Sequence, residues 1–279
     1  MRSLSSEWNF LVLGHRGFIG SEILSFLRVE EIEVLSIAER IDVTNAQSLL
    51  KNVISAETVV INCIASGVTP GTGNYDENYQ TNFHLVQQLC DASLSFGAHG
   101  FIHFASNYEL PRHIRPLASR TPYVETKSKG SGYCLQQIEL GQSVKLAYLP
   151  TVMGLNQPHG RFFRDFVAHL QQQIPFQIKY PGAEIEIITV SSMMEQLDFS
   201  NPTIKWGVQE VIENLRVLVL EFATILNSIL NELGEESLEL VDNNMLKLST
   251  GGYNLDLIQP EVREYFANQL TLALRGSNE

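Results

Sequence analysis

The chain reads Asn9-Phe-Leu-Val-Leu-Gly-His-Arg-Gly-Phe-Ile-Gly20, an apolar run followed by glycines at GxxGxxG spacing. The run Asn9–Leu13 predicts a buried strand, and the residues from Phe18 to Leu27 predict a helix that begins at the glycines. Glycines permit a tight turn and a close backbone approach, and a helix N-terminus offers N–H groups and a positive dipole to an anion. The stretch therefore predicts a loop that binds a pyrophosphate. The alternative is a structural turn whose glycines only let helix and sheet pack closely.

Apolar runs and helical patterns alternate through the first half of the chain. After the glycine loop we expect strands at 32–37, 58–64, 100–106 and 144–149, and helices at 46–54, 78–96 and around Tyr123. Strands that are apolar without interruption, each followed by a helix, indicate a parallel sheet covered on both faces. The predicted fold class is therefore α/β, a doubly wound parallel sheet of the Rossmann type that occupies residues 1–150.

The regular alternation ends after Pro150. We expect a loop at 151–160, a helix at 161–173, a strand at 183–190, a helix at 217–233, a strand at 238–241 and a helix at 260–274. Such a mixture predicts a smaller α+β lobe over residues 151–279 that binds mainly substrate. Some of its elements, at about 183–215, are expected to return to the first domain.

Composition excludes several classes of function. With 279 residues, 44% of them hydrophobic and 18% charged, the chain is long enough for one large domain with an appendage. A formal net charge of -12 argues against nucleic acid or an anionic membrane as the partner. The three cysteines lack CxxC spacing, so we expect no disulfide framework, no metal site and a reducing compartment such as the cytoplasm. No apolar stretch reaches the roughly 20 residues of a membrane span.

Tyr123 and Lys127 are four residues apart, and Ser106 ends an apolar run upstream of them. On a helix such a pair lies on one face, one turn apart. A positive charge beside a phenol lowers its pKa from about 10, so the tyrosine can exchange a proton with a carbonyl or alcohol oxygen that a serine holds. The spacing alone arises often by chance. The catalytic interpretation therefore depends on Ser106 and the glycine loop.

The end of the second predicted strand carries Glu39 and Arg40, where recognition of an adenosine ribose is expected. Glu39 could accept hydrogen bonds from a ribose 2'-hydroxyl, which favours NAD. Arg40, or Arg16 from the glycine loop, could pair with a 2'-phosphate, which favours NADP. Two arginines at one site tilt the prediction slightly towards NADP. Asp42, followed by Val43, is placed to accept from the adenine amino group.

Together these motifs resemble the extended short-chain dehydrogenase/reductases, the group of nucleotide-sugar epimerases, dehydratases and reductases. The resemblance is collinear over nearly the whole chain and includes Asn62-Cys-Ile-Ala65, Asn82 and Leu149-Pro-Thr151. It implies that Ser106, Tyr123 and Lys127 are catalytic, with Tyr123 as the acid. The residues expected to bind NAD or NADP are Gly14, Arg16, Gly17, Phe18, Ile19, Gly20, Glu39, Arg40, Asp42, Val43, Ala65, Ser66, Asn82, Tyr123, Lys127, Pro150 and Thr151.

Within this group the Gly-His-Arg-Gly loop looks most like that of GDP-fucose synthase and dTDP-dehydrorhamnose reductase, which reduce ketosugars. Tyr108 stands near the place of the epimerase cysteine, and Asn107-Tyr-Glu109 replaces the acid pair of the dehydratases, so reduction is favoured. We interpret Glu109 as a surface or substrate-orienting residue and His103 as structural. The candidate substrate residues are Asn107, Tyr108, His159, Arg161 and Arg164.

The resemblance implies an NAD(P)-dependent oxidoreductase that reduces, or epimerises, a keto group of a nucleotide-activated sugar. The chain departs from it near Glu184–Ile188, where many relatives carry an arginine for the diphosphate and this sequence has glutamates. Two alternatives therefore stay open: a reductase of a non-sugar carbonyl compound, and a non-catalytic regulatory or scaffold protein that binds the cofactor. The expected partner is a small molecule rather than nucleic acid or membrane, and the resemblance also allows a homodimer.

Overall fold

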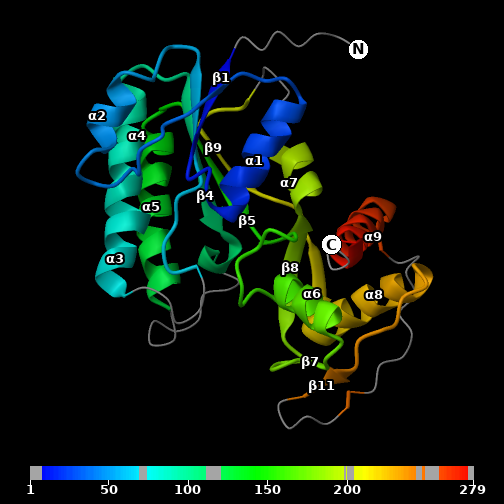
Figure 1. Ribbon diagram of the computed structural model, residues 1–279. Coiled ribbons are helices and arrows are strands. Elements are labelled where there is room, and N and C mark those ends of the chain that lie inside the picture. Colours follow the sequence, from blue (N-terminus) through cyan, green and yellow to red (C-terminus); the bar gives the residue numbers. More distant parts are fainter. Residues whose placement is uncertain are drawn as a thin grey trace. The chain divides into compact units, whose positions relative to one another are not determined.

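The computed structural model describes residues 8–68, 74–110, 121–197, 199, 204–242, 247–248 and 258–275. The chain forms two compact units (Figure 1). The first comprises Met1–Pro150 and Met194–Ile212, and the second comprises Thr151–Met193 and Glu213–Glu279.

The first unit is built on a six-stranded parallel sheet with the strand order β2-β1-β3-β4-β5-β9. Its strands are β1 (Asn9–Leu13), β2 (Val34–Leu35), β3 (Thr58–Asn62), β4 (Gly100–Ser106), β5 (Val144–Leu149) and β9 (Val208–Val211). The central strands are buried along nearly their whole length, as continuous apolar runs require. The predicted doubly wound α/β fold is confirmed.

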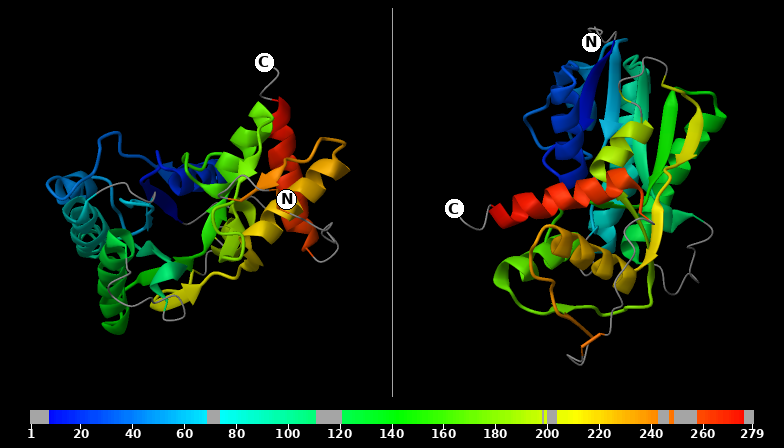
Figure 2. Two further views of the ribbon diagram at one scale, coloured as in Figure 1. Left: turned by 90° about the horizontal axis from the view of Figure 1, so that it is seen from below. Right: turned by 90° about the vertical axis from the view of Figure 1, so that its right-hand side faces the viewer.

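Helices cover both faces of this sheet. They are α1 (Phe18–Val29), α2 (Ala46–Lys51), α3 (Tyr75–Tyr79), the π-helical segment η1 (Gln80–Leu85), α4 (Val86–Ser95) and α5 (Pro122–Glu139). Helices α2, α4 and α5 lie on one face and α1 lies on the other (Figures 1 and 2). The core beneath α2, α4 and α5 includes Leu50, Leu89, Phe101 and Leu146, each fully buried.

Several predicted boundaries in the first unit are wrong. The strand expected at 32–37 contains only two paired residues, because among the described residues β2 is an edge strand that pairs with β1 alone, through Phe10↔Val34 and Leu11↔Leu35. The helix expected at 46–54 ends at Lys51. The helix expected at 78–96 starts earlier, at Tyr75, and is interrupted by η1.

In its described residues, the second unit contains two small sheets and three long helices. Its elements are β6 (Thr151–Met153), α6 (Phe162–Gln172), β7 (Phe176–Gln177), β8 (Glu184–Thr189), β10 (Leu215–Leu218), α8 (Val219–Glu232), β11 (Leu240–Val241) and α9 (Pro260–Arg275); α7 (Val190–Leu197) spans the boundary between the units. Strand β8 pairs in parallel with β6 and antiparallel with β10, and β7 pairs with β11.

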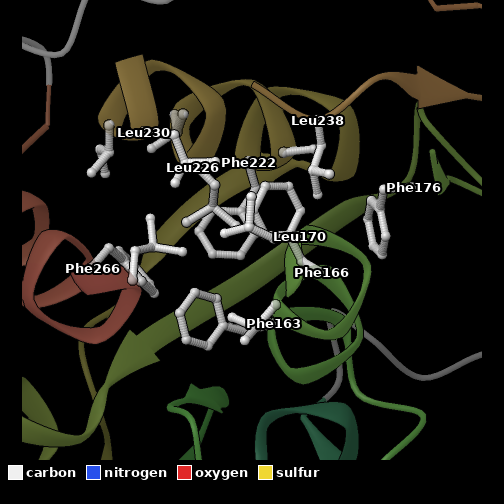
Figure 3. Packing of buried hydrophobic residues seen from close by; sticks show 14 of the residues in the cluster. Phe163, Phe166, Leu170, Phe176, Phe222, Leu226, Leu230, Leu238 and Phe266 are labelled. Atoms are coloured by element: carbon white, nitrogen blue, oxygen red, sulfur yellow. The ribbon is translucent and has the colours of Figure 1, made fainter. Parts of the chain in front are cut away.

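Phenylalanine rings hold the second unit together (Figure 3). Phe222 of α8 lies 5.3 Å from Phe266 of α9, and Phe163 of α6 lies 5.2 Å from the same ring. These three rings are at most 1% exposed. Burial of such rings is the main source of stability in a unit with so little sheet.

Three predicted boundaries in or near the second unit differ from the structure. The loop expected at 151–160 begins with strand β6. The return to the first domain, expected at about 183–215, is confined to Met194–Ile212, because β8 pairs within the second unit. The helix expected to start at Val217 starts at Val219, because Leu215–Leu218 pair with β8.

Candidate functional site

The glycine loop folds tightly between β1 and α1. The Gly17 N–H donates to the Gly14 carbonyl oxygen at 2.9 Å, and Gly14 has φ of +81°. A side chain at Gly20 would place its Cβ 2.3 Å from the Gly14 oxygen, so only glycine allows this approach of helix to loop. No side chain caps the start of α1. Its first N–H groups are therefore available to an anion.

A cavity of about 410 Å³ lies beside this loop, within the size range of small-molecule binding sites. It is formed by the carboxyl ends of β1 and β3, the segment after β2, and η1. In open α/β sheets, ligands bind at this edge of the strands. Its lining residues are Val12, Leu13, Gly14, His15, Arg16, Ile37, Glu39, Arg40, Ile41, Asp42, Val43, Ile64, Ala65, Ser66, Gln80, Thr81 and Leu85.

Many predicted cofactor residues line this cavity. They are Gly14, Arg16, Glu39, Arg40, Asp42, Val43, Ala65 and Ser66. The others lie outside the lining, and their contact with a cofactor stays a prediction. They are Gly17, Phe18, Ile19, Gly20, Asn82, Tyr123, Lys127, Pro150 and Thr151.

Sequence reasoning missed several lining residues. Ile37, Ile41 and Ile64 follow the ends of strands and look like core residues in the sequence. Gln80 and Thr81 come from the π-helical segment, a feature that is frequent at functional sites but invisible in the sequence pattern. The three isoleucines could have been predicted from their position directly after a parallel strand, because ligands bind at this edge of such sheets.

The end of the cavity beside β2 contains two guanidinium groups and two carboxylates. Arg16 Nη2 donates to the Ala38 carbonyl oxygen at 3.0 Å, which fixes the arginine beside Glu39 and Arg40. Asp42 Oδ1 accepts from the Thr44 hydroxyl at 2.6 Å and from its N–H at 2.8 Å. These hydrogen bonds lower the pKa of Asp42, so it is an ionised acceptor.

Asn82 connects the cavity to helix α5. Its side chain is fully buried, accepts from the Ser66 N–H at 2.8 Å and donates to the Ser66 carbonyl oxygen at 3.0 Å. Its second amide hydrogen goes to Thr126 Oγ1, also at 3.0 Å. Both hydrogens are used, so Asn82 positions Ser66 and α5 within the protein.

Ser106 and Glu109 form a compact turn at the carboxyl end of β4. The Ser106 N–H donates to Glu109 Oε1 at 2.6 Å, and Ser106 Oγ accepts from the Tyr108 N–H at 3.3 Å. Glu109 Oε2 is shielded from water, and burial raises the pKa of this carboxyl group. The carboxyl group of Glu109 is therefore not the solvated surface group that one interpretation expected, and the other, a substrate-orienting role, stays a prediction.

Helix α5 presents Tyr123 and Lys127 at its start. Thr121 Oγ1 accepts from the Val124 N–H at 3.3 Å, and Pro122 occupies the first turn, two features that favour a helix beginning here. Tyr123 is half-buried, and Lys127, one turn later, is 4% exposed. Burial lowers the pKa of Lys127, and the nearby Glu109 carboxylate opposes this shift.

A hydrogen-bonded row of side chains lies beneath Lys127. Lys127 Nζ is 3.4 Å from His103 Nε2, and His103 Nδ1 is 3.1 Å from Asn62 Nδ2. Burial, together with the Lys127 charge, holds the pKa of His103 well below its usual value. Sequence reasoning treated His103 as structural, and the structure brings it into contact with a predicted catalytic residue.

The candidate substrate residues are divided between the units. In the first, Asn107 is 3% exposed and Tyr108 is 49% exposed. In the second, His159 is exposed, and Arg161 and Arg164 are half-buried at the start of α6, with Arg164 Nη1 3.4 Å from the Leu155 carbonyl oxygen. Their role in substrate binding stays a prediction.

Two negative observations apply to the described part of the chain. No helix there combines the length and apolar character needed to cross a membrane. No group of three or more histidine, cysteine or acidic side chains there is arranged to hold a metal ion.

Comparison with known proteins identifies a family model for most of the chain. Residues 10–193 match the model of the NAD dependent epimerase/dehydratase family. No curated protein matches the sequence.

Solved structures share the fold at low identity. MoeE5 in complex with UDP-glucose and NAD is 21% identical, with a TM-score of 0.71 over 97% of this chain and 100% of that chain. RMD from Pseudomonas aeruginosa complexed with NADPH is 17% identical, with a TM-score of 0.72 over 97% and 98%. dTDP-glucose 4,6-dehydratase (rfbB) from Bacillus anthracis str. Ames in complex with NAD is 15% identical, with a TM-score of 0.71 over 97% and 98%.

Proposed function

The chain belongs to the NAD dependent epimerase/dehydratase family, and from this we propose that it is an NAD(P)-dependent oxidoreductase that reduces or epimerises a keto group of a nucleotide-activated sugar. One observation carries the proposal. The glycine loop and its cavity lie at the carboxyl edge of the same parallel sheet whose strand β4 ends at Ser106. A dinucleotide at this edge fits the fold, the cavity size and the uncapped start of α1.

The residues around the reacting oxygen would act by proton transfer. The bound nicotinamide supplies or accepts a hydride. Tyr123 donates a proton to the substrate carbonyl oxygen during reduction, and Ser106 Oγ holds that oxygen. Lys127 as an ammonium group, one helical turn from Tyr123, favours the phenolate as it forms.

We favour NADP over NAD. Arg16, fixed by its hydrogen bond to Ala38, and Arg40 both line the cavity end where a 2'-phosphate would lie. Glu39 at the same end is the acceptor expected for NAD. The similar structures named above contain either NAD or NADPH, so they are compatible with both choices.

Nucleotide sugars are the favoured substrates because similar structures contain UDP-glucose or UDP-glucuronic acid. Arg161 and Arg164 are the cationic residues that we assign to the diphosphate, with Asn107, Tyr108 and His159 on the sugar side. We rank reduction first because Tyr108 stands where the epimerase branch has cysteine. One oxygen of the lone Glu109 carboxyl group, Oε1, also accepts from the Ser106 N–H.

One observation favours a second candidate, a reductase of non-sugar carbonyl compounds. Strand β8 carries Glu184 and Glu186, and both pair with Arg216 of β10, at 3.1 Å and 2.8 Å. This arginine is therefore neutralised by the protein itself. The non-catalytic alternative, a cofactor-binding regulatory protein, has no such observation in its favour.

Two further proposals concern the setting of the protein. Its three cysteines are free thiols, which suits the reducing cytoplasm. The resemblance to the family also supports a homodimer, which sedimentation or light scattering would test.

The decisive experiment replaces the proposed acid. Cofactor oxidation is followed by absorbance across a panel of UDP-, dTDP- and GDP-linked keto sugars and simple ketones. Tyr123→Phe should lower turnover by roughly 10²–10⁴-fold. Tyr180→Phe, which changes a tyrosine that is 72% exposed in the second unit, is the matched control and should be as active as the parent.

Three outcomes would contradict this function. Undiminished activity of Tyr123→Phe would refute the role of the tyrosine. Turnover of simple ketones but no nucleotide sugar would favour the second candidate. Tight cofactor binding with no oxidation across the panel would favour the regulatory alternative.

A further inference from the structure

A row of three buried side chains crosses three neighbouring elements of the first unit. Asn62 ends β3, His103 lies in β4 and Lys127 lies in α5. Asn62 and His103 are fully buried, and Lys127 is 4% exposed. Buried polar groups persist where hydrogen bonds satisfy them, so the contacts in this row restrict which atoms carry hydrogen.

The hydrogen positions follow from the Asn62 amide. Its Oδ1 accepts from the Ile64 N–H at 3.0 Å, so the group facing His103 is the Nδ2 donor, at 3.1 Å. His103 Nδ1 must therefore accept, and in a neutral imidazole the hydrogen then resides on Nε2. A doubly protonated ring would set one N–H against the Asn62 donor and the other against Lys127.

This tautomer directs an N–H group at Lys127 Nζ, 3.4 Å away. An amine has a lone pair that can accept such a hydrogen, whereas an ammonium group has three hydrogens and no acceptor. The contact is favourable only after Lys127 has lost a proton.

We propose that His103 is a positioning residue for Lys127: fixed by Asn62, it donates its Nε2 hydrogen to the uncharged amine and so eases loss of a proton from this lysine. The catalytic consequence rests on the proposed function. When Tyr123 has given its proton to the substrate oxygen, Lys127 passes a proton to the phenolate oxygen. The amine that remains accepts the hydrogen bond from His103.

Other groups around Lys127 also influence its protonation. Glu109, at the end of β4, favours the ammonium form, as do the neighbouring thiols Cys63 and Cys134 to the extent that they ionise. Burial raises the pKa of the Cys63 thiol, so it contributes little charge. Burial and His103 thus favour the amine, and Glu109 is the main opposing group.

The tautomer can be measured in the unmodified protein. Nitrogen-15 NMR of labelled histidine distinguishes a protonated from an unprotonated ring nitrogen, and His103→Gln assigns the signal among the seven histidines. We expect His103 to be unprotonated at Nδ1 and protonated at Nε2 near neutral pH. A ring protonated at Nδ1, alone or together with Nε2, would overturn the proposal.

Asn62→Asp should then reverse the donor and acceptor roles in the Asn62–His103–Lys127 row, with almost no change in side-chain shape. The new carboxylate can still accept from the Ile64 N–H and would also accept from a protonated Nδ1. His103 Nε2 then becomes an acceptor that favours the Lys127 ammonium. Carbon-13 NMR of labelled lysine, with the Lys127 signal assigned by Lys127→Arg, should show its titration moving up by about half a pH unit to one unit, the size of one hydrogen bond.

His99→Gln is the matched control, because His99 directly precedes β4, accepts from Trp206 Nε1 and has no described contact with Lys127. It should leave the Lys127 titration unchanged. An unchanged titration in Asn62→Asp, or a shift without reversal of the His103 tautomer, would overturn the proposal, because the new charge alone would then account for it. If Asn62→Asp does not fold, the tautomer of the unmodified protein decides alone.

The same variant separates this inference from the proposed function. With an active substrate, the alkaline limb of the kcat/KM profile should move up together with the Lys127 titration, and a limb that stays in place overturns the catalytic consequence. Absence of turnover on every nucleotide sugar would count against the proposed function, while the NMR measurements would still decide the role of His103.

Discussion

The first unit buries an amide, a histidine and a lysine in one row beside β4, whereas the second unit buries phenylalanine rings between α6, α8 and α9. Side chains bond to side chains across elements in the first unit, through Asn62–His103–Lys127 and Asn82–Thr126. Such a row costs desolvation energy and fixes the positions of particular atoms. A phenylalanine cluster contributes stability without fixing any polar atom. The difference supports our proposal that the acid–base chemistry belongs to the first unit, while the buried rings of the second unit contribute stability.

Truncation of a ring in the second unit should give the largest effect. Phe222→Ala removes a fully buried ring that lies 5.3 Å from both Phe162 and Phe266. Loss of this contact area and the cavity left behind should lower the free energy of unfolding by about 3–5 kcal/mol. Urea titration followed by circular dichroism measures it. Leu272→Ala, at a site 57% exposed in α9, should change it by no more than about 0.5 kcal/mol.

The same variant shows whether the two units are independent. Both tryptophans, Trp8 and Trp206, belong to the first unit, so their fluorescence reports on that unit. If the units unfold separately, Phe222→Ala shifts the circular dichroism transition and leaves the fluorescence midpoint in place. Equal shifts of both signals would contradict this division between the units, because the second unit would then also stabilise the site.

The second prediction concerns the glycine loop. Gly20→Ala places a Cβ 2.3 Å from the Gly14 carbonyl oxygen, a backbone atom that cannot yield without moving the loop. We expect a loss of about 1–3 kcal/mol of stability and at least about tenfold weaker cofactor binding. Denaturant titration and calorimetric titration with NADPH measure the two effects.

Gly132→Ala in α5 is the control, because nothing lies within 4 Å of a Cβ at that position. Alanine is the better helix former, so this variant should gain roughly 0.5–1 kcal/mol. Unchanged NADPH affinity in Gly20→Ala would show that the loop does not hold the pyrophosphate.

The third prediction uses the buried histidine as a pH probe of the first unit. His103 has its pKa held well below the usual value by burial, so in the unfolded chain it takes up a proton that the folded chain does not. Its contribution to stability is present above about pH 6.5 and is lost as the pH falls from there towards the folded pKa. The loss approaches about 1.4 kcal/mol per pH unit at most.

Urea titrations followed by tryptophan fluorescence, at several values below neutrality, measure this slope. His103→Gln should flatten it, whereas His159→Gln, which changes an exposed histidine of the second unit, should follow the parent. If the slope of His103→Gln equals that of the parent, the imidazole does not stay neutral in the folded protein.

Sequence patterns were most reliable where one strand lies between two others. β1, β4 and β5 have the predicted bounds, because each is a continuous apolar run with neighbours on both sides. The strands that were missed, such as β7 and β9, have two to four residues. Their pairing depends on partners far away in the chain, so no local pattern marks them.

The same limit applies to the candidate site. The glycine loop is a local motif, and eight of the 17 residues that line its cavity were predicted from the sequence. The row under Lys127 joins residues 41 and 24 positions apart, and a histidine within an apolar run gives no sign of either partner. Only the register of β3 beside β4, where Asn62 pairs with His103, brings them together.

The smallest predicted effect concerns the choice of cofactor. Arg40→Gln removes one of the two guanidinium groups at the cavity end beside Glu39. If Arg40 pairs with a 2'-phosphate, NADPH should bind about tenfold more weakly, since an exposed charge-assisted contact is worth on the order of 1 kcal/mol. NADH affinity should change little. Calorimetric titration of both cofactors measures the ratio, and Arg28→Gln, which alters an exposed arginine of α1 outside the lining, is the control.

An opposite result would sharpen the assignment of this end of the cavity. If Arg40→Gln leaves the ratio unchanged and Arg16→Gln changes it, the phosphate lies against the arginine fixed by Ala38. If neither variant changes the ratio and Glu39→Gln weakens NADH binding, the Glu39 carboxylate accepts a hydrogen bond from a free ribose hydroxyl. The preference for NADP is then wrong. Because all three side chains come from the first unit, each outcome refines that unit's site without invoking the second.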